Sequence, residues 1–260
     1  MGVAFKRYFV SDLANQVQYI DVNQGYTAVS VVQQPPLSGA KLAVWLYIAP
    51  SDSISRSGNA TVITHAGLRH LIHTGLCTEV GNSEAQTAHI FRSYAAMLAA
   101  EDCTLERNCL RTWVFVRDID LHYAGMAKAR REFFASKGLT KDKHFIASTG
   151  IEGRQYSSPS IVSMDAYAVH GLLPEQITYL HAPSHLNPTH EYGVTFERGT
   201  AIRYPDRRHV LISGTASIDN KGQIVHPHNV LKQAERMMEN IGALLAETGA
   251  TFNDVACLLI

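Results

Sequence analysis

One stretch of this chain occurs twice, and this repeat constrains the fold more than any other feature of the sequence. Gln86 and Gln233 mark the same point of a helix in the two copies and lie 147 positions apart, as do Thr104 and Thr251. Ahead of the helix the offset is 139, because the second copy has a longer hairpin at 219–222. A period of this length indicates a duplicated module and not a solenoid repeat. Two like modules can pair as a pseudo-dimer, and a cleft between them is a common place for a ligand.

The repeat predicts the order of elements in each module. In the first module we expect a hairpin over 61–79, a helix that opens with a capping box at Ser83 and Gln86, a strand at 110–116, a helix at 120–137 and strands at 144–149 and 160–169. The second module has a helix that starts after Asn229 and stops at Gly249. We interpret 51–58 and 152–156 as loops and 171–197 as a long connection. The fold class is α+β, with the helices packed on one face of mixed sheets.

The predicted boundaries give a strand region at 1–60, a first module at 61–172, a connecting segment at 173–200 and a second module at 201–260. Within the strand region, the runs at 26–32 and 41–48 are strand-like. The second copy stops at Ile260, inside the strand predicted at 255–260, so its sheet has unpaired backbone groups. Residues 1–60, another chain, or a native continuation beyond Ile260 would complete it, and we favour the continuation. A native mass well above 28.6 kDa would support that expectation.

Composition excludes several classes of function. The 23 basic residues match the 23 acidic ones, so no net charge favours nucleic acid or an anionic membrane. No run of 18 apolar residues and no signal peptide is present. The four cysteines form no Cys-x-x-Cys pair, which predicts buried thiols in a reducing cytoplasm. The 13 histidines show no zinc-binding spacing, so we expect no metal.

The second module carries a specific order of short motifs, and on it the chain resembles the YjgF/RidA family, also called the endoribonuclease L-PSP family. The stretches that carry this resemblance are Leu211–Gly214, Asp219–Val225, Gln233, Asn240–Ile241, Leu244–Leu245, Gly249–Thr251 and Asp254–Val255. The first module is more diverged, and it keeps Gln86 and the run 113–118. Three segments, at 34–39, 147–154 and 191–198, resemble the tandem branch that contains the chorismatases, which hydrolyse the enolpyruvyl ether of chorismate.

The chain also departs from these families. Simple RidA enzymes hold the substrate carboxylate with an arginine, and Ala147 stands at the matching position here. The resemblance implies that the equivalent arginine of the second module would lie beyond Ile260, as would the acidic catalytic residue of a chorismatase. The reading as an imine deaminase therefore lacks its key residue.

Hydrolysis of an enol ether needs a carboxylic acid that protonates carbon, and a dianionic substrate needs guanidinium groups. Glu152 and Glu191 are the candidate acids, although such residues are more often surface carboxylates. Arg154, in a glycine-rich loop, is the first candidate for a carboxylate clamp, and a solvated loop charge is the alternative. We also expect substrate binding by Tyr192, Arg198, Ser148, Thr149 and Gly150, against the alternatives of a buried tyrosine and an ordinary turn.

On the strand at 110–116, Arg111 and Trp113 share one face, and we expect a core tryptophan and a salt-bridged arginine. The sequence as a whole predicts a cytoplasmic hydrolase with no cofactor that binds a small carboxylated metabolite, with chorismate the named candidate by resemblance. A homo-oligomer is compatible with this reading, and nucleic acid and membrane partners are not expected. The alternatives are a non-catalytic metabolite-binding protein, an enamine or imine deaminase and, from the family's older name alone, RNA cleavage.

Overall fold

The computed structural model describes residues 1–155 and 159–259. Within them the chain forms two compact units, which we describe one at a time. Unit 1 contains Met1–Gly138 and Thr149–Leu172, and unit 2 contains Leu139–Ser148 and Leu173–Ile260. Residues 1–60 therefore belong to unit 1, where the segment 2–49 supplies three strands of a second sheet.

The larger sheet of unit 1 is the first module of the repeat. Its strand order is β4-β5-β6-β10-β7-β8, with β4 Ile54–Ser57, β5 Ala60–His65, β6 Leu68–Cys77, β10 Val162–His170, β7 Cys109–Val116 and β8 Ala147–Glu152. The predicted hairpin is confirmed as β5 and β6, which pair antiparallel. Strand β10 lies between β6 and β7 and is antiparallel to both. The strand predicted at 144–149 instead starts at Ala147 and continues into the segment that we interpreted as a loop.

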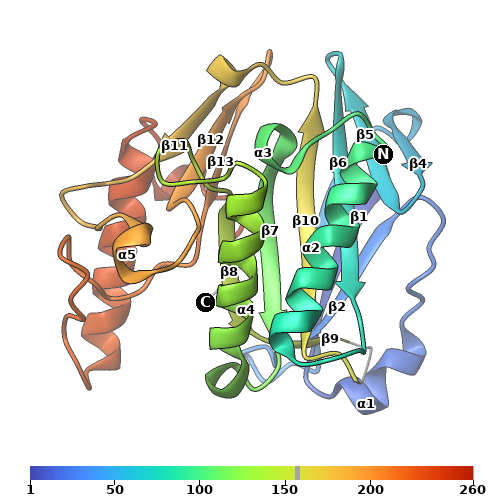
Figure 1. Ribbon diagram of the computed structural model, residues 1–260. Coiled ribbons are helices and arrows are strands. Elements are labelled where there is room, and N and C mark those ends of the chain that lie inside the picture. The colour runs from blue at the N-terminus through green and yellow to red at the C-terminus, as the bar shows by residue number, and fades with distance from the viewer. Residues whose placement is uncertain (156–158, 260) are drawn as a thin grey trace. The chain divides into compact units, whose positions relative to one another are not determined.

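Helices α2 Ser83–Ala99 and α4 Ile119–Ser136 lie side by side on one face of this sheet (Figure 1). Phe91 of α2 meets Phe133 and Phe134 of α4, with ring centroids 6.0 and 5.2 Å apart. The N-cap of α2 is Asn82, whose side chain accepts a hydrogen bond from the backbone of Ala85. The predicted capping box at Ser83 and Gln86 was therefore wrong by one position, because Asn82 is the better acceptor.

A four-stranded sheet packs on the face of the larger sheet opposite to α2 and α4, and its strand order is β3-β1-β2-β9 (Figure 1). Its strands are β1 Gly2–Val10, β2 Ala28–Gln33, β3 Leu42–Ala49 and β9 Arg154–Gln155. Strand β1 is parallel to β2 and antiparallel to β3, so this sheet is mixed. The sequence pattern predicted β2 and β3 and missed β1, because Lys6 and Arg7 interrupt its apolar alternation. The remaining short elements of unit 1 are α1 Leu13–Gln16, η1 Val17–Tyr19, η2 Ser51–Ser53 and α3 Leu105–Asn108.

Unit 2 has a three-stranded antiparallel sheet, β11-β12-β13, with helix α5 against it. Its elements are η3 Pro174–Gln176, β11 Ile177–Leu180, η4 Thr189–Tyr192, β12 Gly199–Arg203, β13 Arg208–Ile212, α5 Val230–Ala246 and η5 Phe252–Asp254. Leu180, Ala201 and Leu244 form the buried centre of the core. The predicted cap Asn229 is confirmed, and Gly249 follows the helix with a φ of +74°.

Four further expectations need correction. Residues 51–58, interpreted as a loop, contain η2 and β4, and the long connection at 171–197 contains β11. The strand predicted at 255–260 is not formed over 255–259, because no neighbouring strand pairs with this segment there; Ile260 and Tyr156 lie outside the described residues. Cys103 and Cys109 are buried as expected, whereas Cys257 is exposed.

None of the described helices is long and apolar enough to cross a membrane. The described residues also contain no group of three metal-ligating side chains.

Gln86 gives a direct test of what the repeat preserves. Its Oε1 accepts hydrogen bonds from the backbone of Ile161 and Val162, at 2.8 and 3.0 Å, where β10 begins. Gln86→Met leaves both N–H groups without this acceptor, so we expect a loss of roughly 2–4 kcal/mol in the free energy of unfolding, measured with urea. The control is Gln233→Met at the equivalent position of α5, where the side chain is partly exposed, and we expect a change under about 0.5 kcal/mol. Equal losses in the two variants would contradict this role of Gln86.

Candidate functional site

A closed loop in unit 2 surrounds the guanidinium group of Arg198. Pro188 and Gly193, which has a φ of +80°, bound the short helix η4. The hydroxyl of Thr189 donates to the carbonyl of Phe196 at 2.6 Å, which closes the loop. The sequence favours this turn because proline starts a helix well and glycine accepts a positive φ without strain. The loop brings Tyr192 of η4 to the residues just before β12.

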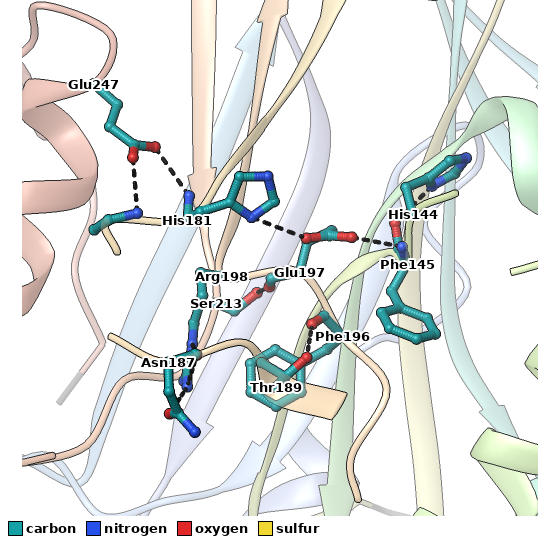
Figure 2. A network of polar contacts seen from close by, with 11 residues as sticks. His144, Phe145, His181, Asn187, Thr189, Phe196, Glu197, Arg198, Ser213 and Glu247 are labelled. Carbon is teal, nitrogen blue, oxygen red and sulfur yellow. Dashed lines mark hydrogen bonds and ion pairs between the residues drawn. The ribbon is translucent and has the colours of Figure 1, made fainter. Parts of the chain in front are cut away.

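Arg198 is buried, with 4% of its surface exposed, and its hydrogen bonds go to neutral oxygens. Nε and Nη2 donate to the carbonyl of Asn187 at 3.2 and 2.8 Å, and Nη2 also donates to Asn187 Oδ1 at 3.1 Å. The guanidinium carbon lies 5.4 Å from the ring centroid of Tyr192 and 5.6 Å from that of Phe196. Figure 2 shows Asn187 beside the end of Arg198.

Burial lowers the pKa of Arg198, and an interaction with Tyr192 opposes this shift in part. In the part of unit 2 that the structure describes, no carboxylate forms an ion pair with Arg198. A buried cation with only neutral acceptors is costly unless an anion joins it. The local chemistry therefore fits a ligand that carries a carboxylate.

Glu197, the next residue, has a structural role. Its Oε1 accepts from the backbone of Phe145 at 2.6 Å, and its Oε2 lies 3.9 Å from Nδ1 of His181. Its carbonyl accepts from the hydroxyl of Ser213, and Figure 2 shows the carboxylate of Glu197 between His181 and Phe145. Because Glu197 is buried and accepts backbone donors, it fixes residues 145–148 against the start of β12.

The structure places four of the predicted site residues in unit 2. Arg198 and Tyr192 lie together as described. Glu191 is exposed, and its Oε2 accepts from Nδ2 of Asn187 at 3.1 Å. The backbone N–H of Ser148 donates to Ser213 Oγ at 2.9 Å and is thus engaged within the protein. Asn187 therefore links Arg198 to Glu191 through its two amide atoms.

The other four predicted residues belong to unit 1. Both carboxylate oxygens of Glu152 accept backbone N–H groups, from Asp118 at 3.1 Å and Ile119 at 2.7 Å, at the start of α4. Thr149 accepts a hydrogen bond from Arg111 at 2.5 Å, and Gly150 packs against Met126 and Tyr123. Arg154 is half-buried in β9. Glu152 thus stabilises a helix end, where negative charge is favoured.

Sequence reasoning missed three residues of this site. Asn187 stood in the long connection without a role, and the only available signal was its place before Pro188. Glu197 and Ser213 lay inside the motifs that carried the family resemblance, but neither was assigned a contact. The hydrogen-bond pairing of Ser213 with residue 148 is long-range, so no local pattern could predict it.

Comparison with solved structures identifies the fold. A chorismatase crystal structure matches 94% of this chain and 72% of its own chain, with a TM-score of 0.66 and 16% sequence identity. A YjgF-family protein from Neisseria meningitidis matches 44% of this chain and 87% of its own (TM-score 0.36, 19% identity), and the YjgF gene product of E. coli matches 48% and 91% (TM-score 0.35, 19% identity). A scan against protein-family models found no match, and a search of curated proteins found none.

The chain therefore has a chorismatase-like α+β fold. This finding confirms the predicted fold class. The resemblance to the tandem branch is thereby shown for the fold. At 16% identity the match does not extend to the substrate.

Ser213 allows the polar framework of the site to be tested. Ser213→Ala removes the acceptor of the buried Ser148 N–H, so we expect a loss of about 1–3 kcal/mol in unfolding free energy. Ser217→Ala is the control, because that partly exposed hydroxyl donates only to the carbonyl of Val225 and its loss should cost under about 1 kcal/mol. Urea unfolding of both variants provides the measurement, and a Ser213 variant as stable as wild type would remove this residue from the framework.

Proposed function

We propose that this protein is a hydrolase that acts on a small carboxylated metabolite, and that cleavage of the enolpyruvyl ether of chorismate is its leading candidate reaction. The chorismatase-like fold supports this proposal in general terms. The observation that carries it is Arg198, a buried guanidinium whose acceptors in the described part of unit 2 are all neutral.

A carboxylate bound at Arg198 would provide the negative charge that the loop lacks. Arginine binds carboxylates through two parallel hydrogen bonds and stays ionised at neutral pH. Nε and Nη2 of Arg198 donate to Asn187, and Tyr192 also hydrogen-bonds to the guanidinium, so a ligand carboxylate would bind beside these neutral partners. The aromatic faces of Tyr192 and Phe196 hold the plane of the group and limit its movement.

The reaction itself needs an acid and water. Proton transfer to the terminal carbon of the enol ether gives an oxocarbenium ion, water adds to it, and the resulting hemiketal releases pyruvate and an alcohol. Glu191 is the better candidate for the acid of the two that the sequence predicted. Its carboxylate is exposed and is joined to Arg198 through Asn187, whereas Glu152 caps α4 with both oxygens.

The second candidate function is a non-catalytic metabolite-binding protein. The observation that favours it concerns two carboxylates. Glu197 and Glu152 both accept backbone hydrogen bonds, so neither is placed to act as a catalytic acid. The deaminase alternative has less support, because Ala147 is fully buried where that reaction would require an arginine.

Arg198 variants test the binding site. With chorismate as the probe, we expect Arg198→Lys to weaken binding at least about tenfold, since a bidentate charged contact is worth roughly 1.5–3 kcal/mol. Arg203→Ala at the end of β12, the strand that follows Arg198, is the control, because its side chain is exposed. Isothermal titration calorimetry gives the dissociation constants, and circular dichroism checks the fold. Equal affinities for wild type and Arg198→Lys would exclude Arg198 from the site.

Glu191→Gln separates catalysis from binding. A general acid contributes about 10²–10⁴ in rate, so we expect pyruvate release to fall at least about 100-fold while the affinity for chorismate changes only a few-fold. A coupled lactate dehydrogenase assay follows the pyruvate. Normal turnover by this variant would show that Glu191 is not the acid. Tight binding without turnover by wild type would replace the hydrolase with the metabolite-binding alternative.

A further inference from the structure

A second buried guanidinium lies in unit 1, between its two sheets. Arg7 of β1 is fully buried, and its Nη2 donates to Oδ2 of Asp165 in β10 at 2.9 Å. The other oxygen of Asp165 accepts from the backbone of Gly75 at 2.9 Å. Both carboxylate oxygens are therefore already used by the protein.

Four aromatic rings surround Arg7. Its guanidinium carbon lies between 4.8 and 5.4 Å from the ring centroids of Phe5, Trp45, Trp113 and Phe115. These rings stabilise the positive charge through their faces. Trp45 and Trp113 are themselves half-buried, whereas Arg7 is fully buried.

Several buried hydrogen-bond donors of the sheet that carries Arg7 have no partner among the described residues. They are Nε and Nη1 of Arg7, the hydroxyl of Ser30 and Nε2 of Gln155, and all three residues are more than nine-tenths buried. Arg7 lies opposite Ser30 in the register of β1 and β2, and Gln155 lies opposite Val32, two residues further along. Residues in register point to the same face of a sheet, so the three side chains face the interior together.

Arg111 adds positive potential to this interior. Its guanidinium carbon lies 5.1 Å from the ring centroid of Trp113, which Arg7 also approaches. Burial and, to a smaller extent, the positive charge of Arg7 together lower the pKa of Arg111 to about 9. The two guanidinium groups therefore repel each other, and an anion near them would reduce that repulsion.

We propose that Arg7, Ser30 and Gln155 form a binding site for a small monovalent anion, either a carboxylate group or an inorganic ion of similar size. The unpartnered atoms at this site can all donate, and a buried donor without an acceptor destabilises the folded protein. An anion accepts from several donors at once and also neutralises charge. The site lies within unit 1 and does not depend on the function proposed for Arg198.

The chain has two tryptophans, and both line the cage around Arg7, so intrinsic fluorescence reports directly on this site. Sodium acetate and sodium chloride are titrated separately into the full chain at pH 7. The ionic strength is held constant with the sodium salt of a bulky sulfonate buffer. We expect a saturable change in fluorescence and a parallel rise in the thermal midpoint.

The variants Gln155→Met and Ser30→Ala each remove one neutral donor and keep both guanidinium groups. Each should weaken anion binding about fivefold, the equivalent of a neutral hydrogen bond. Without the anion, each should leave the thermal midpoint unchanged or raise it, because an unpaired buried donor is gone. Gln18→Met, at an exposed glutamine of unit 1, is the matched control and should bind the anion like wild type.

Saturation by acetate alone identifies a carboxylate site, and saturation by both salts identifies a site for any small monovalent anion; either result supports the proposal. A response that does not saturate, or one that is the same in wild type, Gln155→Met and Ser30→Ala, overturns it. Arg7→Lys should also lose most of the response. If that variant does not fold, Gln155→Met and Ser30→Ala still decide the question.

Discussion

Burying an arginine is the physical constraint on which both units of this protein depend. A guanidinium group carries five N–H donors and a charge that burial does not remove at neutral pH, so its surroundings must supply acceptors and a stabilising field. In unit 1, Asp165 and four aromatic rings surround Arg7. The ion pair of Arg7 with Asp165 joins the two sheets. In unit 2, a loop holds Arg198 through the neutral oxygens of Asn187 and the ring of Tyr192.

The two arrangements differ in what they leave unsatisfied, and this difference links structure to function. Arg7 has an internal carboxylate and retains unpartnered donors, so its interior suits a small anion. Arg198 has acceptors and lacks a carboxylate in the described part of unit 2, so its loop suits a ligand that brings one. Glu197 and Ser213 fix the backbone around this loop. Because the loop is already ordered, ligand binding would cost less conformational entropy.

The sequence predicted best those elements that are determined by neighbouring residues, such as helices and their caps. The repeat at Gln86 and Gln233 located helices α2 and α5, and the caps at Asn229 and Gly249 marked the ends of α5. Strand β1 was missed because Lys6 and Arg7 break its apolar alternation, although Arg7 is fully buried. A charge that is neutralised by Asp165, 158 positions away in the chain, leaves no local signal.

The candidate site shows the same division. Arg198 and Tyr192 were recognised from a motif and lie together in unit 2, whereas Glu152 and Ser148 are engaged in backbone hydrogen bonds that no motif revealed. Asn187 was overlooked because its role arises only when the loop at 187–198 closes on itself. Contacts of this kind depend on tertiary packing, which residue spacing does not encode.

The central claim is that the guanidinium of Arg198 binds a carboxylate of the substrate. The most direct measurement combines a change in the protein with a change in the ligand: the affinities of wild type and Arg198→Lys for chorismate and for its monomethyl esters, by calorimetry. We expect one ester to bind to wild type much more weakly than chorismate does. The same ester should bind to the variant nearly as well as chorismate does, because two groups in contact are energetically coupled. Esterification losses that are equal in the two proteins for every ester would contradict the claim.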